Sequence, residues 1–170
     1  MTNAETQLAA LFTNFEPAIA RLGKALRKKL RARLPGFFEV VYHYERQGSL
    51  LLAYSPTERG YDAVCSLGLY PEQVKLFFAR GPLLAGADPQ RLLTGSGKVV
   101  RYVEMAKAGE LDRPEIEALM VAALDLAKAC PVAGTEGAIV LKVEEQAQRA
   151  SRAKRAPRAA SPGRGRTPRR

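Results

Sequence analysis

Apolar positions in the first 34 residues recur at steps of three and four, the spacing of one face of a helix. They are Leu8, Leu11, Phe12, Phe15, Ile19, Leu22, Leu26 and Leu30. Pro17 lies inside this stretch, where its ring removes a backbone donor and clashes with the preceding turn. The pattern therefore predicts a helical segment over residues 4–34 that kinks or restarts at Pro17 and ends in the turn Leu34-Pro35-Gly36.

Between about residues 39 and 105 the apolar positions alternate with polar ones, which predicts about five short strands. The first two, over 40–45 and 50–54, form a hairpin that turns at Gln47-Gly48. The other three are expected at about 62–70, 73–78 and 99–105. Residues 81–97 are expected to be mostly loop, with one short helical turn that Asp88 caps and Pro89 begins.

A second helical pattern covers about residues 114–129, with Ile116, Leu119, Met120, Ala123, Leu124 and Ala127 on one face. Asp112 and Glu115 have the spacing of a capping box at its start. Residues 138–143 fit either a further strand or the start of a helix, so the extension over 132–146 stays open. The order of elements predicts an α+β fold: a single antiparallel sheet with the N-terminal and C-terminal helices on one face.

The net charge of +10 is concentrated at the C-terminal end of the chain. Residues 147–170 contain no Asp or Glu and nine basic side chains: Arg149, Arg152, Lys154, Arg155, Arg158, Arg164, Arg166, Arg169 and Arg170. The first 146 residues carry 18 basic and 17 acidic side chains, so they are nearly neutral. We therefore predict a folded domain over 1–146 and a disordered Arg/Ala/Pro tail over 147–170, which has too little apolar surface to offset the entropy of ordering.

Such a tail attracts polyanions, chiefly because binding releases their counterions. We expect non-specific nucleic-acid binding that weakens as salt rises, since an extended basic segment has no geometry for reading bases. A solubilising extension without a dedicated partner is the alternative.

Cys65 and Cys130 occur without a secretory leader or a disulfide framework, which favours free thiols in a reducing compartment. No apolar run approaches the roughly 18 residues that span a bilayer. The expected location is the cytoplasm, with no membrane partner, and the oligomeric state stays open.

The segment Thr94-Gly95-Ser96-Gly97-Lys98 invites comparison with a phosphate-binding loop, but it lacks the first glycine and the Ser or Thr after the lysine. A glycine turn before the fifth strand is the simpler interpretation. The backbone N–H groups of such a turn can also form a concave anion site with nearby cations. The candidate anion-binding residues are Arg80, Gly95, Gly97, Lys98 and Arg101.

No other residues form a recognisable catalytic or metal-binding pattern. His43 is the only histidine and has no Cys or carboxylate at ligand spacing. Cys65 is expected on a buried strand face, and Cys130 follows a helix C-terminus that disfavours a thiolate. The six tyrosines are mostly strand residues, which pack across strands or stack on ligands and bases. With no nucleophile–base pair, cofactor motif or paired carboxylates, we expect no catalytic residue, no cofactor and no metal.

Residues 34–112 carry several motifs together: Leu34-Pro35-Gly36, Glu39-Val40-Val41, Arg80-Gly81, Asp88-Pro89, the run 92–98 and Arg101-Tyr102-Val103. In these motifs the chain resembles the YdhG-like family, a bacterial domain of unknown function. The resemblance covers about residues 20–130 and implies a compact helix–sheet–helix domain. A member of that family has been called frataxin-like, with a proposed role in handling iron. That role needs acidic oxygen ligands along the first helix, whereas this helix is basic from Arg21 to Arg33.

These observations predict a non-enzymatic, cytoplasmic binding module for an anionic ligand or partner, with a tail that adds non-specific affinity for nucleic acid. A frataxin-like iron-handling protein is the alternative, and an enzyme of unknown type is the third hypothesis.

Overall fold

The computed structural model of the chain describes residues 2–142. Its α-helices are α1 (Asn3–Phe12), α2 (Pro17–Arg33) and α3 (Pro114–Ala127), and its 3₁₀ helices are η1 (Glu45–Gln47), η2 (Gly60–Asp62), η3 (Gly81–Ala87) and η4 (Ala108–Asp112). The strands are β1 (Phe38–Tyr44), β2 (Ser49–Ser55), β3 (Cys65–Leu69), β4 (Val74–Phe78), β5 (Arg101–Glu104) and β6 (Ile139–Leu141). Within the described residues, no helix combines the length and the apolar character that crossing a membrane requires.

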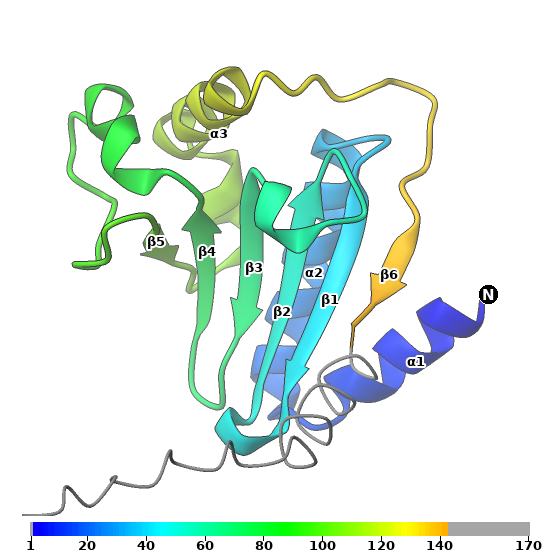
Figure 1. The fold of residues 1–170 in the computed structure, drawn as a ribbon. Coiled ribbons are helices and arrows are strands. Elements are labelled where there is room, and N and C mark those ends of the chain that lie inside the picture. The colour runs from blue at the N-terminus through cyan, green and yellow to red at the C-terminus, as the bar shows by residue number, and fades with distance from the viewer. Residues whose placement is uncertain (1, 143–170) are drawn as a thin grey trace, which may run out of the picture.

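The strands form one sheet in the order β5-β4-β3-β2-β1-β6 (Figure 1). The first five are an antiparallel meander, and β6 returns to the far edge and pairs parallel to β1. The α+β class is therefore confirmed, but the expectation of five antiparallel strands is wrong, because the described part of the sheet has six strands and is mixed. The sequence left 138–143 open because so short an apolar run fits helix or strand. Backbone hydrogen bonds from Glu39 N to Ala138 O and from Lys142 N to Val41 O make it a strand, which also covers the free edge of β1.

The N-terminal helical segment is interrupted as the proline predicts. Helix α1 ends at Phe12, and Pro17 is the first residue of α2. At that position a backbone N–H would have no acceptor within the helix, so proline costs no hydrogen bond. Along α2 the buried residues are Gly23, Leu26 and Leu30, one helical face directed at the sheet.

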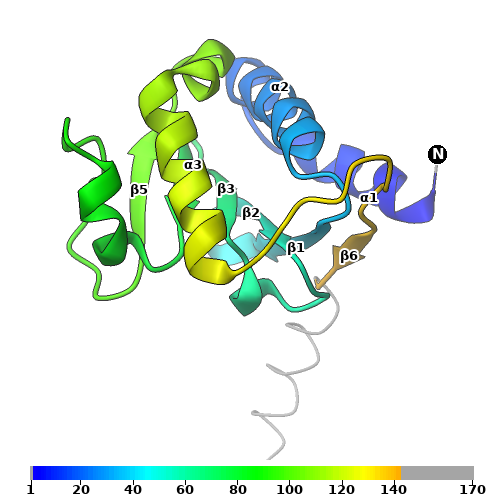
Figure 2. The same cartoon turned by 90° about the horizontal axis from the view of Figure 1, so that it is seen from above.

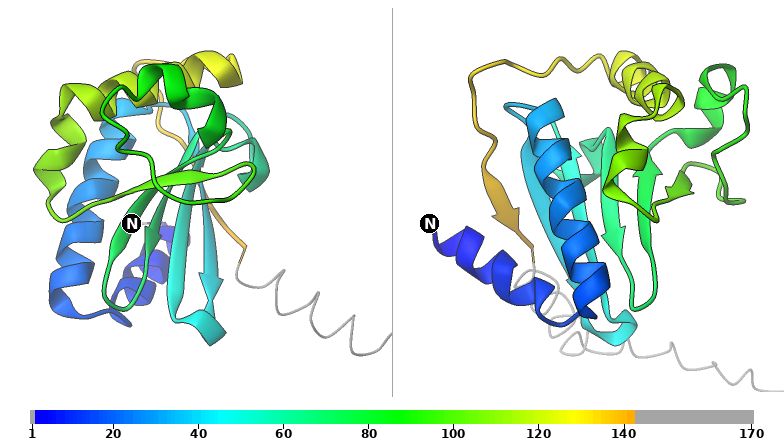
Figure 3. Two further views of the ribbon diagram at one scale, coloured as in Figure 1. Left: turned by 90° about the vertical axis from the view of Figure 1, so that its left-hand side faces the viewer. Right: turned by 180° about the vertical axis from the view of Figure 1, so that it is seen from behind.

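The three α-helices contribute to one core on a single face of the sheet. Seen from behind, α2 lies lengthwise over the strands (Figure 3), and seen from above, α3 runs across the end of the sheet (Figure 2). The opposite face of the sheet is turned toward the viewer in Figure 1, and none of the helices within residues 2–142 lies over its lower half. Its upper part is partly covered by the turn that contains η2.

Two capping predictions are wrong. The helical turn lies at Gly81–Ala87, before Asp88, because Pro82 begins it early; the Asp88 carboxylate instead accepts the N–H groups of Leu92 and Leu93, both at 2.8 Å. The N-cap of α3 is Arg113 rather than Asp112. Asp112, the last residue of η4, pairs with Lys29 and Arg33 at the end of α2, so it ties η4 to α2.

Two strands are shorter than expected. The third begins at Cys65 because 60–62 form η2, and the fifth begins at Arg101, after a bend at residues 98 and 99. The tail predicted over 147–170, with its nine basic residues, lies outside the described residues.

Candidate binding face on the open side of the sheet

Strand alternation divides the side chains of the sheet between the core and the open face. On the core side lie Val41, Leu50, Leu52, Tyr54, Cys65, Leu67, Leu69, Val74, Leu76 and Phe78. Their neighbours along each strand point the other way. This places Tyr42 and Tyr44 on the open face of β1, Phe77 on that of β4, and Tyr102, which pairs with Phe77, on that of β5.

We call the five rings of Tyr42, Tyr44, Tyr70, Phe77 and Tyr102 the aromatic face. The Tyr70 and Phe77 centroids are 6.3 Å apart, and those of Phe77 and Tyr102 are 5.6 Å apart, both with tilted rings. Tyr42 and Tyr44 stack at 6.4 Å with an interplanar angle of 19°. These are the separations at which aromatic pairs attract one another, so the rings form rows of fixed geometry.

Strand β3 makes a depression between these rings. Its open-face residues are Ser66 and Gly68, which pair in register with Phe77 and Lys75 on β4. A Cβ on Gly68 would lie 2.7 Å from the Phe77 ring, so the ring occupies the space that a side chain would need. A hollow of about 300 Å³ opens here, lined by Tyr44, Gln47, Ser49, Leu50, Leu51, Ser66, Tyr70, Phe77 and Val100. Its volume is that of the smallest ligand pockets.

One cation lies among the rings. The Lys75 ammonium is 4.2 Å from the Tyr102 centroid and 5.6 Å from that of Tyr70, and its side chain is only 16% exposed. Glu104 is its nearest acid at 4.0 Å. Burial, followed by the charges of Tyr44 and Tyr102, raises the pKa of Tyr70. The raised pKa keeps the Tyr70 phenol neutral at neutral pH, beside the Lys75 side chain.

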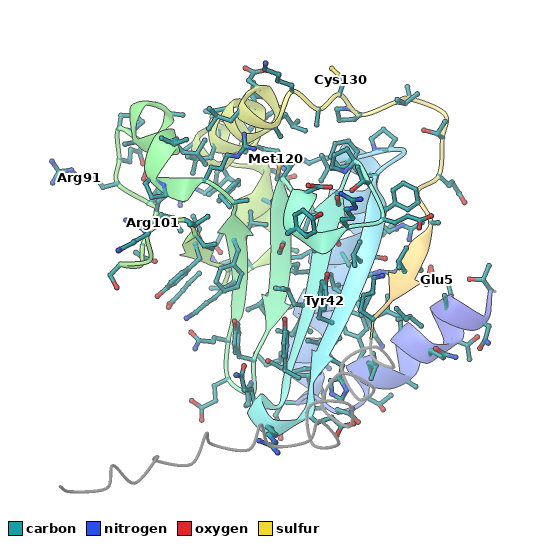
Figure 4. All side chains as sticks on the ribbon, viewed as in Figure 1. Glu5, Tyr42, Arg91, Arg101, Met120 and Cys130 are labelled. Carbon is teal, nitrogen blue, oxygen red and sulfur yellow. The ribbon has the colours of Figure 1, made fainter. Side chains whose placement is uncertain are left out.

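The turn around η2 limits the upper boundary of the aromatic face. Gly60 lies directly against the Tyr42 hydroxyl, and no side chain would fit between them. Figure 4 shows Tyr42 in front of the sheet, on the side away from α2. Tyr42 is therefore partly covered, whereas Tyr44 at the lower end of β1 is 36% exposed.

The five predicted anion-binding residues lie in one region but do not converge on one point. The Gly81 N–H donates to Val99 O at 2.8 Å, which brings the turn after Arg80 against the start of β5. Arg80 nevertheless turns away and donates at 2.6 Å to Leu126 O, at the C-terminal end of α3. Arg101 donates to Gly97 O and Val100 O in its own loop.

Arg80 and Arg101 therefore line different cavities. Arg80 borders one of about 280 Å³ between α3 and the turn at η2, and Arg101 borders one of about 600 Å³ beside η3. Arg91, exposed and with φ of 55°, also lines the second cavity, and both arginines project from the left side of Figure 4. Gly95, Gly97 and Lys98 are exposed in the intervening loop and line neither cavity.

The remaining candidates for chemistry lie apart from one another. Cys65 is fully buried, as expected, and burial raises the pKa of its thiol to about 12; Cys130 is exposed. His43 is half-buried on β1. Among residues 2–142, no group of three or more His, Cys, Asp or Glu side chains could hold a metal ion.

Sequence reasoning missed the most buried charge of the described residues. Glu39, 1% exposed on the core side of β1, accepts hydrogen bonds from Arg27, Arg31 and Tyr54. Part of the basic surface predicted for the first helix is thus an internal ion-pair network. The sequence did contain a signal for this network: Glu39 occupies an inward position of a predicted strand, and a buried carboxylate requires positively charged partners.

Comparisons with models of protein families, with curated proteins and with solved structures find no match for this chain. The resemblance to the YdhG-like family therefore stays a prediction from the motifs of the sequence.

Proposed function

We propose that this chain is a non-enzymatic binding module that holds an anionic ligand bearing a planar ring on the open face of its sheet. The observation that carries the proposal is the row Tyr70, Phe77 and Tyr102, which lies on the face opposite the helices with Lys75 among the rings. Aromatic rings on an open sheet stack planar groups, and a neighbouring ammonium attracts negative charge.

The hollow gives the ligand's ring a defined place. Leu51 and Ser66 line it together with the rings of Tyr44, Tyr70 and Phe77. The contact would be mostly apolar, and Gln47, Ser49 and Ser66 are among the residues of its lining that carry polar groups. Pockets of small ligands combine apolar walls with a few polar groups in this way.

The test is a titration of the full-length chain followed by NMR of its aromatic side chains. Adenosine monophosphate is the probe, adenosine is the control without charge, and inorganic phosphate is the control without a ring. We expect both ring-bearing probes to shift the signals of Tyr44, Tyr70 and Phe77, adenosine monophosphate at lower concentration, and phosphate to leave them in place. If neither ring-bearing probe shifts these signals at millimolar concentration, the proposal is wrong.

The cavity beside η3 supports a second candidate, a site for a small anion without a ring. Arg91 and Arg101 both line it, and the one acid in its lining, Asp88, is held by two backbone N–H groups. In the same titration, shifts of the Arg91 and Arg101 side-chain signals with phosphate alone would favour this site over the aromatic face.

A further inference from the structure

We propose a second binding site, for a small zwitterion of the class of the free α-amino acids, in the cavity between α3 and the turn that contains η2. The cavity has a volume of about 280 Å³ and shares no lining residue with the hollow of the aromatic face or with the cavity beside η3. In Figure 1 the turn and α3 both lie at the upper end of the sheet. The site is therefore separate from the surface on which the proposed function rests.

One cation and one acid line this cavity. They are Arg80, which directly precedes η3, and Asp62, the last residue of η2. Among residues 2–142 neither side chain forms an ion pair, either with the other or with a third residue. Two opposite charges that border one space without pairing leave room for a ligand between them.

Arg80 has a fixed position, and most of its hydrogen-bonding capacity is unused. Its backbone is left-handed, with φ of 57°, and its Nη1 donates at 2.6 Å to Leu126 O in the last turn of α3. Within the part of the chain that the structure describes, its side chain makes no other hydrogen bond. A guanidinium has five N–H groups in a planar fork that matches the two oxygens of a carboxylate. Arg80 is therefore the partner for the carboxylate of the ligand.

Asp62 is held by the hydrogen bonds of its turn. The Thr57 hydroxyl donates at 2.7 Å to Asp62 Oδ2, and the Asp62 N–H donates to Arg59 O. The buried Ser55 hydroxyl donates to the same Arg59 O and accepts the Thr57 N–H. Asp62 Oδ1 has no hydrogen-bond partner within residues 2–142, so it is the acceptor for an ammonium. Because the turn is already ordered, binding there costs little conformational entropy.

The presence of both charges determines the class of the ligand. A simple anion would pair with Arg80 but would cover Asp62 without giving it a partner, and a simple cation would do the reverse. Covering a charge without a partner is costly. A free α-amino acid carries an ammonium and a carboxylate at neutral pH, so it pairs with both side chains. The cavity is at the small end of ligand pockets, which start at about 300 Å³, and this favours a molecule of that size.

The rest of the lining limits the side chain of the amino acid. It consists largely of short apolar residues: Ala63, Val64, Ala79, Val99, Ala123 and Ala127. Among the described residues, no third charged side chain lines the cavity. A short aliphatic side chain would make apolar contacts there, whereas a charged one would find no partner. Valine has both the charges and the side chain that the site requires.

The test is an NMR titration of the full-length chain that follows the backbone amide signals of Ala63, Ala79 and Ala127. L-valine is the probe, L-valinamide is the control without a carboxylate, and N-acetyl-L-valine is the control without an ammonium. We expect L-valine to shift these signals at millimolar concentration. Each control should bind at least about tenfold more weakly, because it lacks one charge-assisted hydrogen bond. If L-valine causes no shift, or if either control binds as tightly, the inference is wrong.

Two variants remove one charge each and keep the local hydrogen bonds. In Asp62→Asn the side chain can still accept from Thr57, and in Arg80→Gln it can still donate to Leu126 O. We expect each variant to bind L-valine at least about tenfold more weakly than the parent. Arg91→Gln is the matched control, because Arg91 is also exposed and left-handed, with φ of 55°, but lines the cavity beside η3. Unchanged affinity in both charge variants overturns the inference.

Ala127→Leu tests the same site without changing a charge. Ala127 is half-buried at the end of α3, and leucine is a good helix former, so the larger side chain fills the cavity while the helix persists. We expect this variant to lose the response to L-valine, and circular dichroism checks that each variant is folded. A folded Ala127→Leu that binds L-valine like the parent overturns the inference, also in the case that a charge variant unfolds.

The two proposals fail separately, because the two sites have no residue in common. If adenosine monophosphate shifts the signals of the aromatic face and L-valine shifts none, only the zwitterion site is wrong. If L-valine shifts the signals of Tyr44, Tyr70 and Phe77 instead of those of the three alanines, the inference is also wrong.

Discussion

Glu39 and Tyr54 lie opposite each other on β1 and β2, and the Tyr54 hydroxyl donates a hydrogen bond of 3.1 Å to the Glu39 carboxylate. Both side chains are 1% exposed. From α2, Arg27 and Arg31 donate to the same carboxylate at 2.8 and 3.2 Å. A carboxylate this buried is stable only when it is paired and hydrogen-bonded, so the network joins α2 to the first two strands.

Replacing Glu39 should destabilise the fold strongly. Burial lowers the pKa of Arg27, but the hydrogen bonds and charges of Glu39 and Glu5 outweigh that effect and hold it above its ordinary value. In Glu39→Gln both arginines stay charged and lose this partner. We expect the free energy of unfolding to fall by about 3 kcal/mol, the low end for breaking a buried pair, since the arginines keep some contact with solvent. Urea unfolding at pH 7 measures it.

Two further variants serve as controls for this prediction. Glu5 also binds Arg27, at 3.0 Å, but its side chain is one-third exposed, so Glu5→Gln should cost under about 1 kcal/mol. Tyr54→Phe removes one hydrogen bond to a charged group and should cost about 1.5 kcal/mol. Equal losses for Glu5→Gln and Glu39→Gln would contradict the central position of Glu39.

Asp112 should make the stability of the contact between α2 and η4 depend on pH. A hydrogen bond from Lys29, and then the charges of Lys29 and Arg33, lower the pKa of Asp112. A carboxyl with a lowered folded pKa contributes stability above its unfolded pKa, about 3.9, and loses it as pH falls through the folded value. Asp112→Asn should therefore lower the urea midpoint at pH 7, and the gap from the parent should shrink at acid pH. A gap that is constant with pH would contradict the charge argument.

Much of the architecture can be predicted from the spacing of apolar residues, because buried side chains recur every three or four residues in a helix and every second residue in a strand. Leu26 and Leu30 mark the inner face of α2, and Val41 and Tyr42 mark the two sides of β1. The same alternation places each tyrosine on one side of its strand. It does not say that Phe77 lies beside Tyr102 and Tyr70, since strand neighbours and register depend on the turns between them. The aromatic face therefore could not be drawn from the sequence.

The anion candidates illustrate a second limit. Arg80 directly precedes Gly81 and Arg101 follows the turn with Gly95 and Gly97, yet their side chains line different cavities. Arg80 has φ of 57°, a left-handed conformation that is uncommon for residues with a side chain. No spacing rule predicts this conformation or the hydrogen bond from Arg80 to Leu126 O at the end of α3. Tertiary contacts override the local pattern at this position.

The two thiols should differ in reactivity. Cys65 is buried with its pKa raised to about 12, so it stays protonated and covered at pH 8, whereas Cys130 is exposed. Only the thiolate is a good nucleophile. A thiol reagent should label one cysteine quickly in the native chain and both in denaturant. Peptide mapping that finds native labelling at Cys65 as fast as at Cys130 would contradict its burial.

Gly23 should be a position where alanine destabilises a helix. In the middle of an exposed helix, Gly→Ala gains about 1 kcal/mol. A Cβ at Gly23 would lie 2.6 Å from the Leu69 Cδ2 and 3.1 Å from the Phe12 ring, inside a core where overpacking costs about 1–3 kcal/mol. The second effect is the larger, because Leu69 and Phe12 are themselves fully enclosed and have little room to move. We therefore expect Gly23→Ala to lower the free energy of unfolding by about 1 kcal/mol. Gly86→Ala is the control, since a Cβ there meets nothing within 4 Å and the change should not destabilise the chain. A gain in stability for Gly23→Ala would mean that α2 lies farther from the sheet than the structure shows.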